Sequence, residues 1–291
     1  MKEKYINIPD KLPEQKYFVS GGCSFTTSMV YDSWPEATCE LMNFVNLNTA
    51  FSGIGNNLIL MNVLNTVQRL IKHDVPSEDI VVGVMWSGAD RTEFYRNQWQ
   101  EDIQPMKKQG FMTPIRFIEE SNGYWVPLTP VAVGFINEMA GRFFPSYTKR
   151  YAELGQIMYD EFFFSDTTRV INTLRSVLTL QEFLKNHKIK YFFTRYVKNA
   201  FIEKCWDDPE VSWLVDLIDW DMFIEGGEFE WCFDNTDLPF QKEVRFSHEG
   251  DMKIDARNVH GRDPNIVAHP TTQQHAIYAE QVIVPRLKTI L

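Results

Sequence analysis

Short apolar segments alternate with longer segments of helical spacing along this chain, and this alternation is what most restricts its fold. Apolar runs bounded by glycine, serine or charged residues occur at 17–20, 44–47, 80–86 and 189–194. Runs of this length and composition are typical of buried strands. Buried strands that alternate with helices favour a parallel sheet wrapped by helices.

The segments between these runs carry the spacing of amphipathic helices. Residues 57–73 place Leu60, Leu64 and Val67 on one helical face and polar residues on the opposite face. Residues 168–187 have a similar pattern. We therefore expect a helix in each of these two segments.

Two stretches interrupt the alternation, at about 95–165 and about 200–260. Both are rich in aromatic residues, proline and glycine, so we interpret them as insertions in a single domain that spans residues 1–291. Insertions in an open α/β sheet tend to lie at the carboxyl ends of the strands, where ligands also bind. They would form a lid or an assembly surface, or they would be packing elaborations without a function of their own.

The composition argues against several classes of protein. The chain has 291 residues, of which 44% are hydrophobic and 14% aromatic, so it has enough apolar material for a core. The 39 acidic and 29 basic residues give a net charge of −10, which argues against nucleic acid as a partner. Apolar runs such as 80–86 fall far short of the roughly 20 residues that cross a bilayer, so we expect no membrane association.

The cysteines and the first residues indicate a cytoplasmic protein. Cys23, Cys39, Cys205 and Cys232 form no CxxC pair. The first residues, MKEKYINIPDKLPEQ, lack the apolar stretch of a signal peptide. Both features favour a reducing environment inside the cell.

A tight turn of small residues, GGCSFT at 21–26, follows the first predicted strand. It would leave the hydroxyl of Ser24 at the end of a strand, where a substrate can reach it. Glycines permit a sharp turn, and a helix that starts after it would supply amide donors for an oxyanion. Ser24 is thus either a nucleophile or the cap of a helix.

A serine becomes nucleophilic only when a base takes its proton, so the catalytic interpretation requires a histidine. His73 and His187 are expected near the ends of the two helices, where they interact with the helix dipole. His248 and His260 lie in the second insertion. His269 lies in a loop just before the final helix, whose start is marked by a proline and two threonines, and it is the candidate base.

Four short blocks, taken in order, resemble the SGNH (GDSL-like) hydrolase family, and most of all the SGNH-type proteins of tailed phages that infect aquatic bacteria. They are GCSFT at 22–26, NTAFSGIGNN at 48–57, MWSGADR at 85–91 and HPTTQQH at 269–275. Each block alone is a weak signal, but four in the right order and strand context are hard to obtain by chance. The resemblance implies a flavodoxin-like three-layer α/β/α sandwich with a parallel central sheet, the SGNH hydrolase fold.

The resemblance also implies how the oxyanion is bound. The backbone amides of Ser24 and Gly53 would be two donors. The family normally has an asparagine where this chain has Ala89, so the third donor stays open. Ser87, through its hydroxyl or its amide, and the side-chain amide of Asn56 are the two candidates.

The acidic partner of the base departs from the pattern of the family. The family places it three residues before the histidine, where this chain has Ile266. Asp263 is the nearest acidic residue, and Pro264 could turn the chain back so that it orients His269. Without a carboxylate the site would be a Ser-His dyad, and weakened or lost activity would follow.

Two other chemistries would use the same residues. Cys23 could be the nucleophile, but successive residues of an extended turn point apart, so we expect it to pack inside. A metal site from His260, His269, His275 and Asp263 would lack the HxH or HExxH spacing that brings two ligands together. We therefore expect neither a metal nor another cofactor, and we expect His275 on the helix surface or behind the site.

The predicted function is that of a serine hydrolase that cleaves a small acyl ester, for example an O-acetyl group on a carbohydrate, through Ser24 and His269. A phage-encoded enzyme of this kind would act in the host cytoplasm. The alternative is a phage structural or assembly protein that keeps the SGNH fold without turnover. In that case the aromatic insertions would mediate self-association or contact with a virion partner.

Overall fold

The central feature of the fold is a four-stranded sheet in which every neighbouring pair of strands is parallel. A computed structural model describes residues 8–27, 32–51, 53–96, 124–128, 165–240, 245–246, 252–253 and 269–291, and within them the sheet order is β2-β1-β3-β6. The strands are β1 (Tyr17–Gly21), β2 (Val45–Asn48), β3 (Ile80–Trp86) and β6 (Lys190–Arg195). Every residue of β1 and β3 is buried, as expected for strands covered on both faces. The predicted α/β class with a parallel sheet is confirmed.

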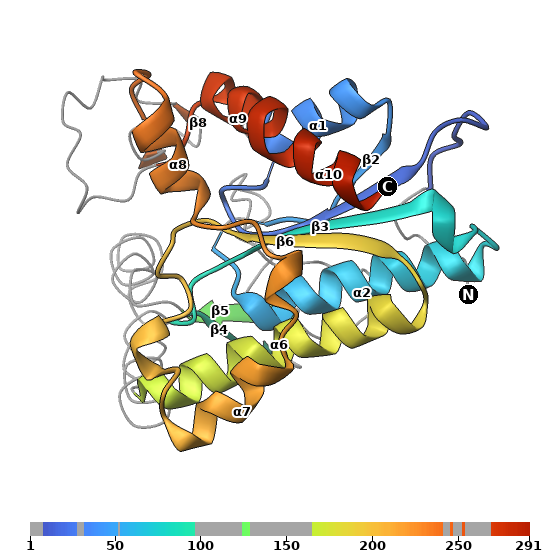
Figure 1. The fold of residues 1–291 in the computed structure, drawn as a ribbon. Helices are drawn as coiled ribbons and strands as arrows, with labels where there is room; N and C mark the ends of the chain where they lie inside the picture. Colours follow the sequence, from blue (N-terminus) through green and yellow to red (C-terminus); the bar gives the residue numbers. More distant parts are fainter. Residues whose placement is uncertain are drawn as a thin grey trace.

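Helices cover both faces of this sheet, which gives three layers consistent with a flavodoxin-like α/β/α fold (Figure 1). One layer contains α1 (Trp34–Met42), α9 (Thr272–Tyr278) and α10 (Val284–Ile290), with a π-helical turn at Ala279–Ile283 that joins the last two. The other layer contains α2 (Asn56–Lys72) and α6 (Asp166–Asn186), and α7 (Pro209–Leu217) packs against α6. Both helices predicted from amphipathic spacing, α2 and α6, are therefore present.

The predicted strands agree with the observed ones to within one residue. The segment 80–86 is β3 in full, whereas the predicted runs at 44–47 and 189–194 each begin one residue before β2 and β6. At β2 the difference has a structural cause. Asn43 ends α1 in a left-handed conformation with φ of 54°, and the chain joins the sheet only at Val45, whose amide donates to the carbonyl of Lys16 at 2.8 Å.

Aromatic side chains from neighbouring strands and α1 meet on one face of the sheet. The ring of Phe18 lies 6.0 Å from that of Trp34 and 6.3 Å from that of Phe192, and all three side chains are fully buried. A Cβ atom at Gly83, on the strand between them, would lie 2.7 Å from Phe18 and 2.6 Å from Phe192. Glycine at this position therefore lets the two rings approach across β3.

Most of the remaining described elements lie within or beside the two stretches that interrupt the βα alternation. β4 (Thr92–Arg96) pairs with β5 (Tyr124–Leu128), and β7 (Arg245–Phe246) pairs with β8 (Met252–Lys253), both antiparallel. α8 (Glu228–Asn235) buries Phe229 and Cys232 in the core. Single 3-10 turns occur at Ser77–Asp79, Glu203–Cys205 and Trp220–Met222. None of the helices in the described ranges combines the length and apolar character needed to cross a membrane.

Candidate active site

Ser24 and His269 meet beyond the carboxyl end of β1. Ser24 lies in the turn that follows β1, and His269 lies three residues before α9. The Nε2 atom of His269 is 2.7 Å from the Oγ atom of Ser24, although the two residues are 245 positions apart. Both residues are half-buried. The serine hydroxyl can donate its hydrogen to the imidazole, which is the geometry that a nucleophile and its base require.

The pair lies where the direction of the strand order reverses. β2 flanks β1 on one side and β3 flanks it on the other, so the connections after β1 and β3 diverge at this edge of the sheet. Open α/β sheets bind ligands outside the carboxyl ends of the strands at such a switch point. The location therefore agrees with a substrate site.

The turn that carries the serine requires glycine at position 22. A Cβ atom at Gly22 would lie 2.1 Å from the Oγ1 atom of Thr26 and 3.1 Å from the carbonyl oxygen of Met85. A side chain at position 22 would therefore collide with Thr26 within the turn, and the carbonyl near the end of β3 adds to the crowding.

Hydrogen bonds from α1 and β2 hold the other end of the turn. The hydroxyl of Ser33 and the amide of Asn48 both donate to the carbonyl oxygen of Thr26, each at 2.7 Å. The indole of Trp34 donates to Thr26 Oγ1 at 3.2 Å. The first described helix after the turn begins only at Trp34, so Ser24 is not the cap of a described helix.

The surroundings of His269 favour its neutral form. Burial lowers the pKa of His269 to about 4, and the electrostatic interactions with His275 and Arg91 act in the same direction. Its ring packs against that of Phe25 at 4.7 Å between centroids. A neutral imidazole has a lone pair on one nitrogen, so at neutral pH the ring can accept the serine proton.

The loop that carries Gly53 is tied to the turn of the nucleophile. The amide of Phe51 donates to the carbonyl oxygen of Gly22 at 3.2 Å. Gly53 has a φ of 79°, in the left-handed region that favours glycine, and a Cβ atom there would meet no atom within 4 Å. The backbone conformation, not lack of space, is thus the reason for glycine at position 53.

Asn56 and Ser87 bind each other. The amide of Ser87 donates to Asn56 Oδ1 at 2.7 Å, while Asn56 Nδ2 donates to the carbonyl oxygen of Ser87 at 3.0 Å and to Thr173 Oγ1 at 3.1 Å. The side-chain amide of Asn56 and the backbone amide of Ser87 are therefore engaged in joining β3 to α2 and α6. The hydroxyl of Ser87 is buried and has no hydrogen-bond partner within the described part of the chain.

Ala89 occupies the position at which the family that the four sequence blocks resemble has asparagine. It is buried, and its backbone amide donates to the carbonyl oxygen of Ala200 at 2.8 Å. Neither its side chain nor its amide can then donate to an oxyanion, so the loop after β3 provides no donor at this position.

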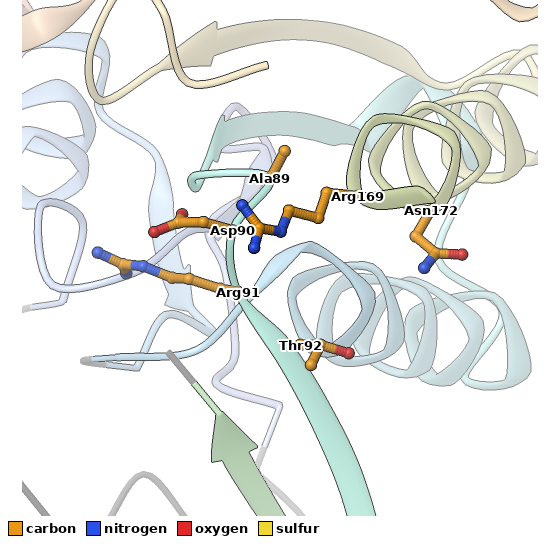
Figure 2. A pocket seen from close by; sticks show the side chains of 6 residues that line it. All are labelled: Ala89, Asp90, Arg91, Thr92, Arg169 and Asn172. Atoms are coloured by element: carbon orange, nitrogen blue, oxygen red, sulfur yellow. The ribbon is translucent and has the colours of Figure 1, made fainter. Parts of the chain in front are cut away.

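Arg91, two residues further along this loop, interacts electrostatically with His269, although the sequence alone indicated no role for it. Its guanidinium lies 5.5 Å from the centroid of the Tyr196 ring, and that ring packs edge-on against Phe25 at 5.2 Å. Arg91 lines a hollow of about 20 Å³, room for a single water molecule, between the loop and α6 (Figure 2). The other lining residues are Ala89, Asp90, Thr92, Arg169 and Asn172.

A second histidine of the final block forms a buried pair with an acid. His275 Nδ1 is 2.6 Å from Glu228 Oε1, and both side chains are completely buried. Burial raises the pKa of Glu228. Of the two places expected for His275, the helix surface is wrong, because its side chain is completely buried against Glu228 at the start of α8. The other place, behind the site, stays a prediction.

The other single-residue expectations have these outcomes. His73 and His187 are the C-cap residues of α2 and α6, as expected from the helix spacing. Cys23 is fully buried, in agreement with a packing role. Asp263 and Ile266 lie outside the described residues, so the acidic partner of His269 stays a prediction.

Two of the four residues of the metal alternative, His260 and Asp263, lie outside the described residues, as does His248. Within the described ranges, no three histidine, cysteine, aspartate or glutamate side chains are grouped as metal ligands would be.

In a comparison with known proteins, no protein-family model and no curated protein matches this chain. The candidate site therefore has to be judged on its own geometry.

Proposed function

We propose that this protein is an SGNH-type serine hydrolase that cleaves a small acyl ester with Ser24 as nucleophile and His269 as base. The observation that carries the proposal is the distance of 2.7 Å between Ser24 Oγ and His269 Nε2. The two residues belong to the first and last of the four sequence blocks. The pKa of His269, about 4, keeps the ring neutral and able to take the serine proton at neutral pH, but it also makes the ring a weaker base than an ordinary histidine.

The reaction would proceed in two acyl-transfer steps. His269 Nε2 takes the proton of Ser24 while Oγ forms a bond to the ester carbon, and the carbonyl electrons move to the oxygen. The backbone amides of Ser24 and Gly53 would donate hydrogen bonds to this oxyanion. The oxyanion then collapses, and the leaving alkoxide takes the proton from His269. Water, deprotonated by the same imidazole, then attacks the acyl carbon. The bond to Ser24 Oγ breaks, the acid leaves and the imidazolium returns its proton to Oγ.

The substrate class follows from the family resemblance alone. It favours a small acyl group, such as acetyl on a carbohydrate.

The proposal predicts that Ser24→Ala abolishes both turnover of a short-chain nitrophenyl ester and labelling by a fluorophosphonate. The substitution removes the nucleophile, which typically costs many orders of magnitude in rate, and it leaves no sizeable cavity. Ser212→Ala on α7, a half-buried serine far along the chain from the site, is the matched control and should keep full activity. Thermal unfolding should be nearly unchanged in both variants. Equal background hydrolysis by wild type and Ser24→Ala would refute the proposal.

The second candidate function is a structural or assembly role without turnover. It is favoured by the loop after β3, in which Ala89 replaces the expected asparagine and its amide is bonded to Ala200. A protein of this kind would not react with the fluorophosphonate at all, so the same labelling experiment separates the two functions.

A further inference from the structure

Arg91 and Ser24 extend from neighbouring strands of the sheet. β1 and β3 pair in parallel, with Gly21 opposite Val84, so the turn after β1 and the loop after β3 leave the sheet at the same edge. The loop turns back on itself, since the amide of Arg91 donates to the carbonyl oxygen of Gly88 at 3.3 Å. The side chain of Arg91 thus leaves the chain at the same edge of the sheet as the turn of the nucleophile.

A continuous series of ring contacts connects Arg91 to the catalytic pair. The guanidinium lies over Tyr196 at 5.5 Å, Tyr196 meets Phe25 at 5.2 Å, and Phe25 meets His269 at 4.7 Å. Figure 2 shows the side chain of Arg91 pointing away from Arg169 and Asn172 of α6. Arg91 is therefore directed away from the helix layer that lines the other side of the hollow.

The guanidinium of Arg91 is buried and charged, but one of its donors has no acceptor within the described ranges. Burial works against the charge, whereas interactions with Cys23, Tyr196 and Asp90, among them a side-chain hydrogen bond to Cys23, outweigh burial, so the pKa of Arg91 is raised and the group stays charged. One terminal nitrogen, Nη1, is buried and has no hydrogen-bond partner among the described residues. A buried donor on a cation is costly unless an acceptor binds it, and a negatively charged oxygen is the best acceptor available to a guanidinium.

We propose that Arg91 stabilises the oxyanion that forms when Ser24 attacks the ester, in place of the asparagine that Ala89 replaces. The inference rests on the proposed function and extends it to a third oxyanion-binding group. As the Oγ–carbon bond forms, the carbonyl electrons move to the oxygen and the serine proton moves to His269. The fixed cation of Arg91 interacts more strongly with this negative oxygen than with the neutral ester, so it lowers the barrier without tightening substrate binding.

The test compares Arg91→Ala, Arg91→Met and Arg91→Lys with wild type on a neutral nitrophenyl acetate and on a matched nitrophenyl ester whose acyl chain ends in a carboxylate. The Ala and Met variants should lose about 100-fold or more in kcat on both esters, the usual effect of removing one oxyanion donor. KM should change little. Arg91→Lys should keep part of the rate, and added guanidine, far below denaturing concentrations, should restore part of the Arg91→Ala rate.

Arg175→Ala is the control, because Arg175 is an exposed arginine of α6 that does not line the hollow. Its kcat should equal that of wild type. Thermal unfolding checks the fold of each variant, and Arg91→Met carries the test if the Ala variant does not fold.

The outcomes separate this inference from the proposed function. A wild type that hydrolyses both esters, together with an Arg91→Met variant that is equally fast, would overturn the role of Arg91 alone. A loss confined to the carboxylate-bearing ester, seen as a higher KM, would also overturn it and would make Arg91 a substrate-binding group instead. A wild type that neither hydrolyses an ester nor reacts with the fluorophosphonate would overturn both.

Discussion

At the scale of single residues, the protonation of His269 decides whether the proposed base can act. Burial has the largest influence on the pKa of His269, followed by His275 and Arg91, and all three oppose the imidazolium. A carboxylate at the other ring nitrogen would act in the opposite direction, because it stabilises the charged ring. The pKa of His269 therefore reports whether an acid such as Asp263 completes the site.

We expect kcat/KM of the wild type to fall only as the pH drops through about 4, instead of near the ordinary histidine value of 6.5. The base must be neutral to work, so activity is present above the pKa of His269 and is lost below it. The unfolded chain takes up this proton at about pH 6.5. Because the folded protein takes up this proton only at about pH 4, the free energy of unfolding should also decrease as the pH falls from about 6.5 to 4.

Ester hydrolysis measured across the acidic range would give this profile, with circular dichroism at each pH to exclude unfolding. An inflection at or above pH 6.5 would contradict the expectation. It would favour a Ser-His-Asp triad over a dyad. Asp263→Asn should then lower that inflection.

At the scale of elements, α1 and β2 determine where the turn of the nucleophile sits. Glu36 accepts from the backbone amide and the hydroxyl of Ser33 at 3.1 and 2.8 Å, which forms the capping box of α1. Its other oxygen accepts from Asn46 at 2.8 Å and from Asn48 at 3.1 Å. One carboxylate thus joins a helix start to a strand, and Asn48 extends the connection to Thr26.

Glu36→Ala should lower the free energy of unfolding by about 1–2 kcal/mol, since it removes a helix cap and leaves two side-chain amides without this acceptor. It should also reduce kcat, because Thr26 and the turn that it anchors lose part of their support. Glu40→Ala on the same helix, at an exposed position, is the control and should change neither quantity measurably. Urea unfolding followed by circular dichroism, together with ester turnover, would test this. Equal stability of the two variants would show that the network around Glu36 does not hold the turn.

At the scale of the whole molecule, the buried pair of Glu228 and His275 joins parts of the chain that are distant in sequence. Glu228 begins α8, within the stretch that interrupts the βα alternation, and His275 lies on α9, six residues after the proposed base. Glu228 Oε2 has no hydrogen-bond partner among the described residues. The pair therefore connects the position of α8 to that of the segment that carries His269.

Glu228→Ala should destabilise the protein by about 3 kcal/mol or more, because it leaves His275 buried without its acidic partner. Glu228→Gln should cost less, since its amide oxygen can still accept from Nδ1. Asp234→Ala, at an exposed position of the same helix, is the control. Thermal and urea unfolding would measure these differences, and a double variant with His275→Ala should be less destabilised than the sum of the two single ones. Additive effects would mean that the pair does not act as a unit.

The sequence by itself was sufficient for the architecture and for the two residues of the proposed chemistry. Strand and helix periodicity are local, so β3 could be located to the residue and α2 and α6 to within two residues. Ser24 and His269 could be chosen because a glycine-rich turn after a strand and a histidine before a helix are local signals too. The capping box at Ser33 and Glu36 would also have identified α1, which was not predicted.

Only the tertiary structure decided which polar groups are still available at the site. Asn56 and Ser87 bind each other although they are 31 positions apart, and the amide of Ala89 donates to Ala200 in the loop after β6. No local sequence pattern predicts these contacts. The same holds for Arg91 beside Tyr196 and for Glu228 against His275. Short-range spacing fixes the elements and the ends of strands. The pairing of buried donors, acceptors and charges depends on how distant segments pack, and it is this pairing that separates an engaged amide from one that can bind an oxyanion.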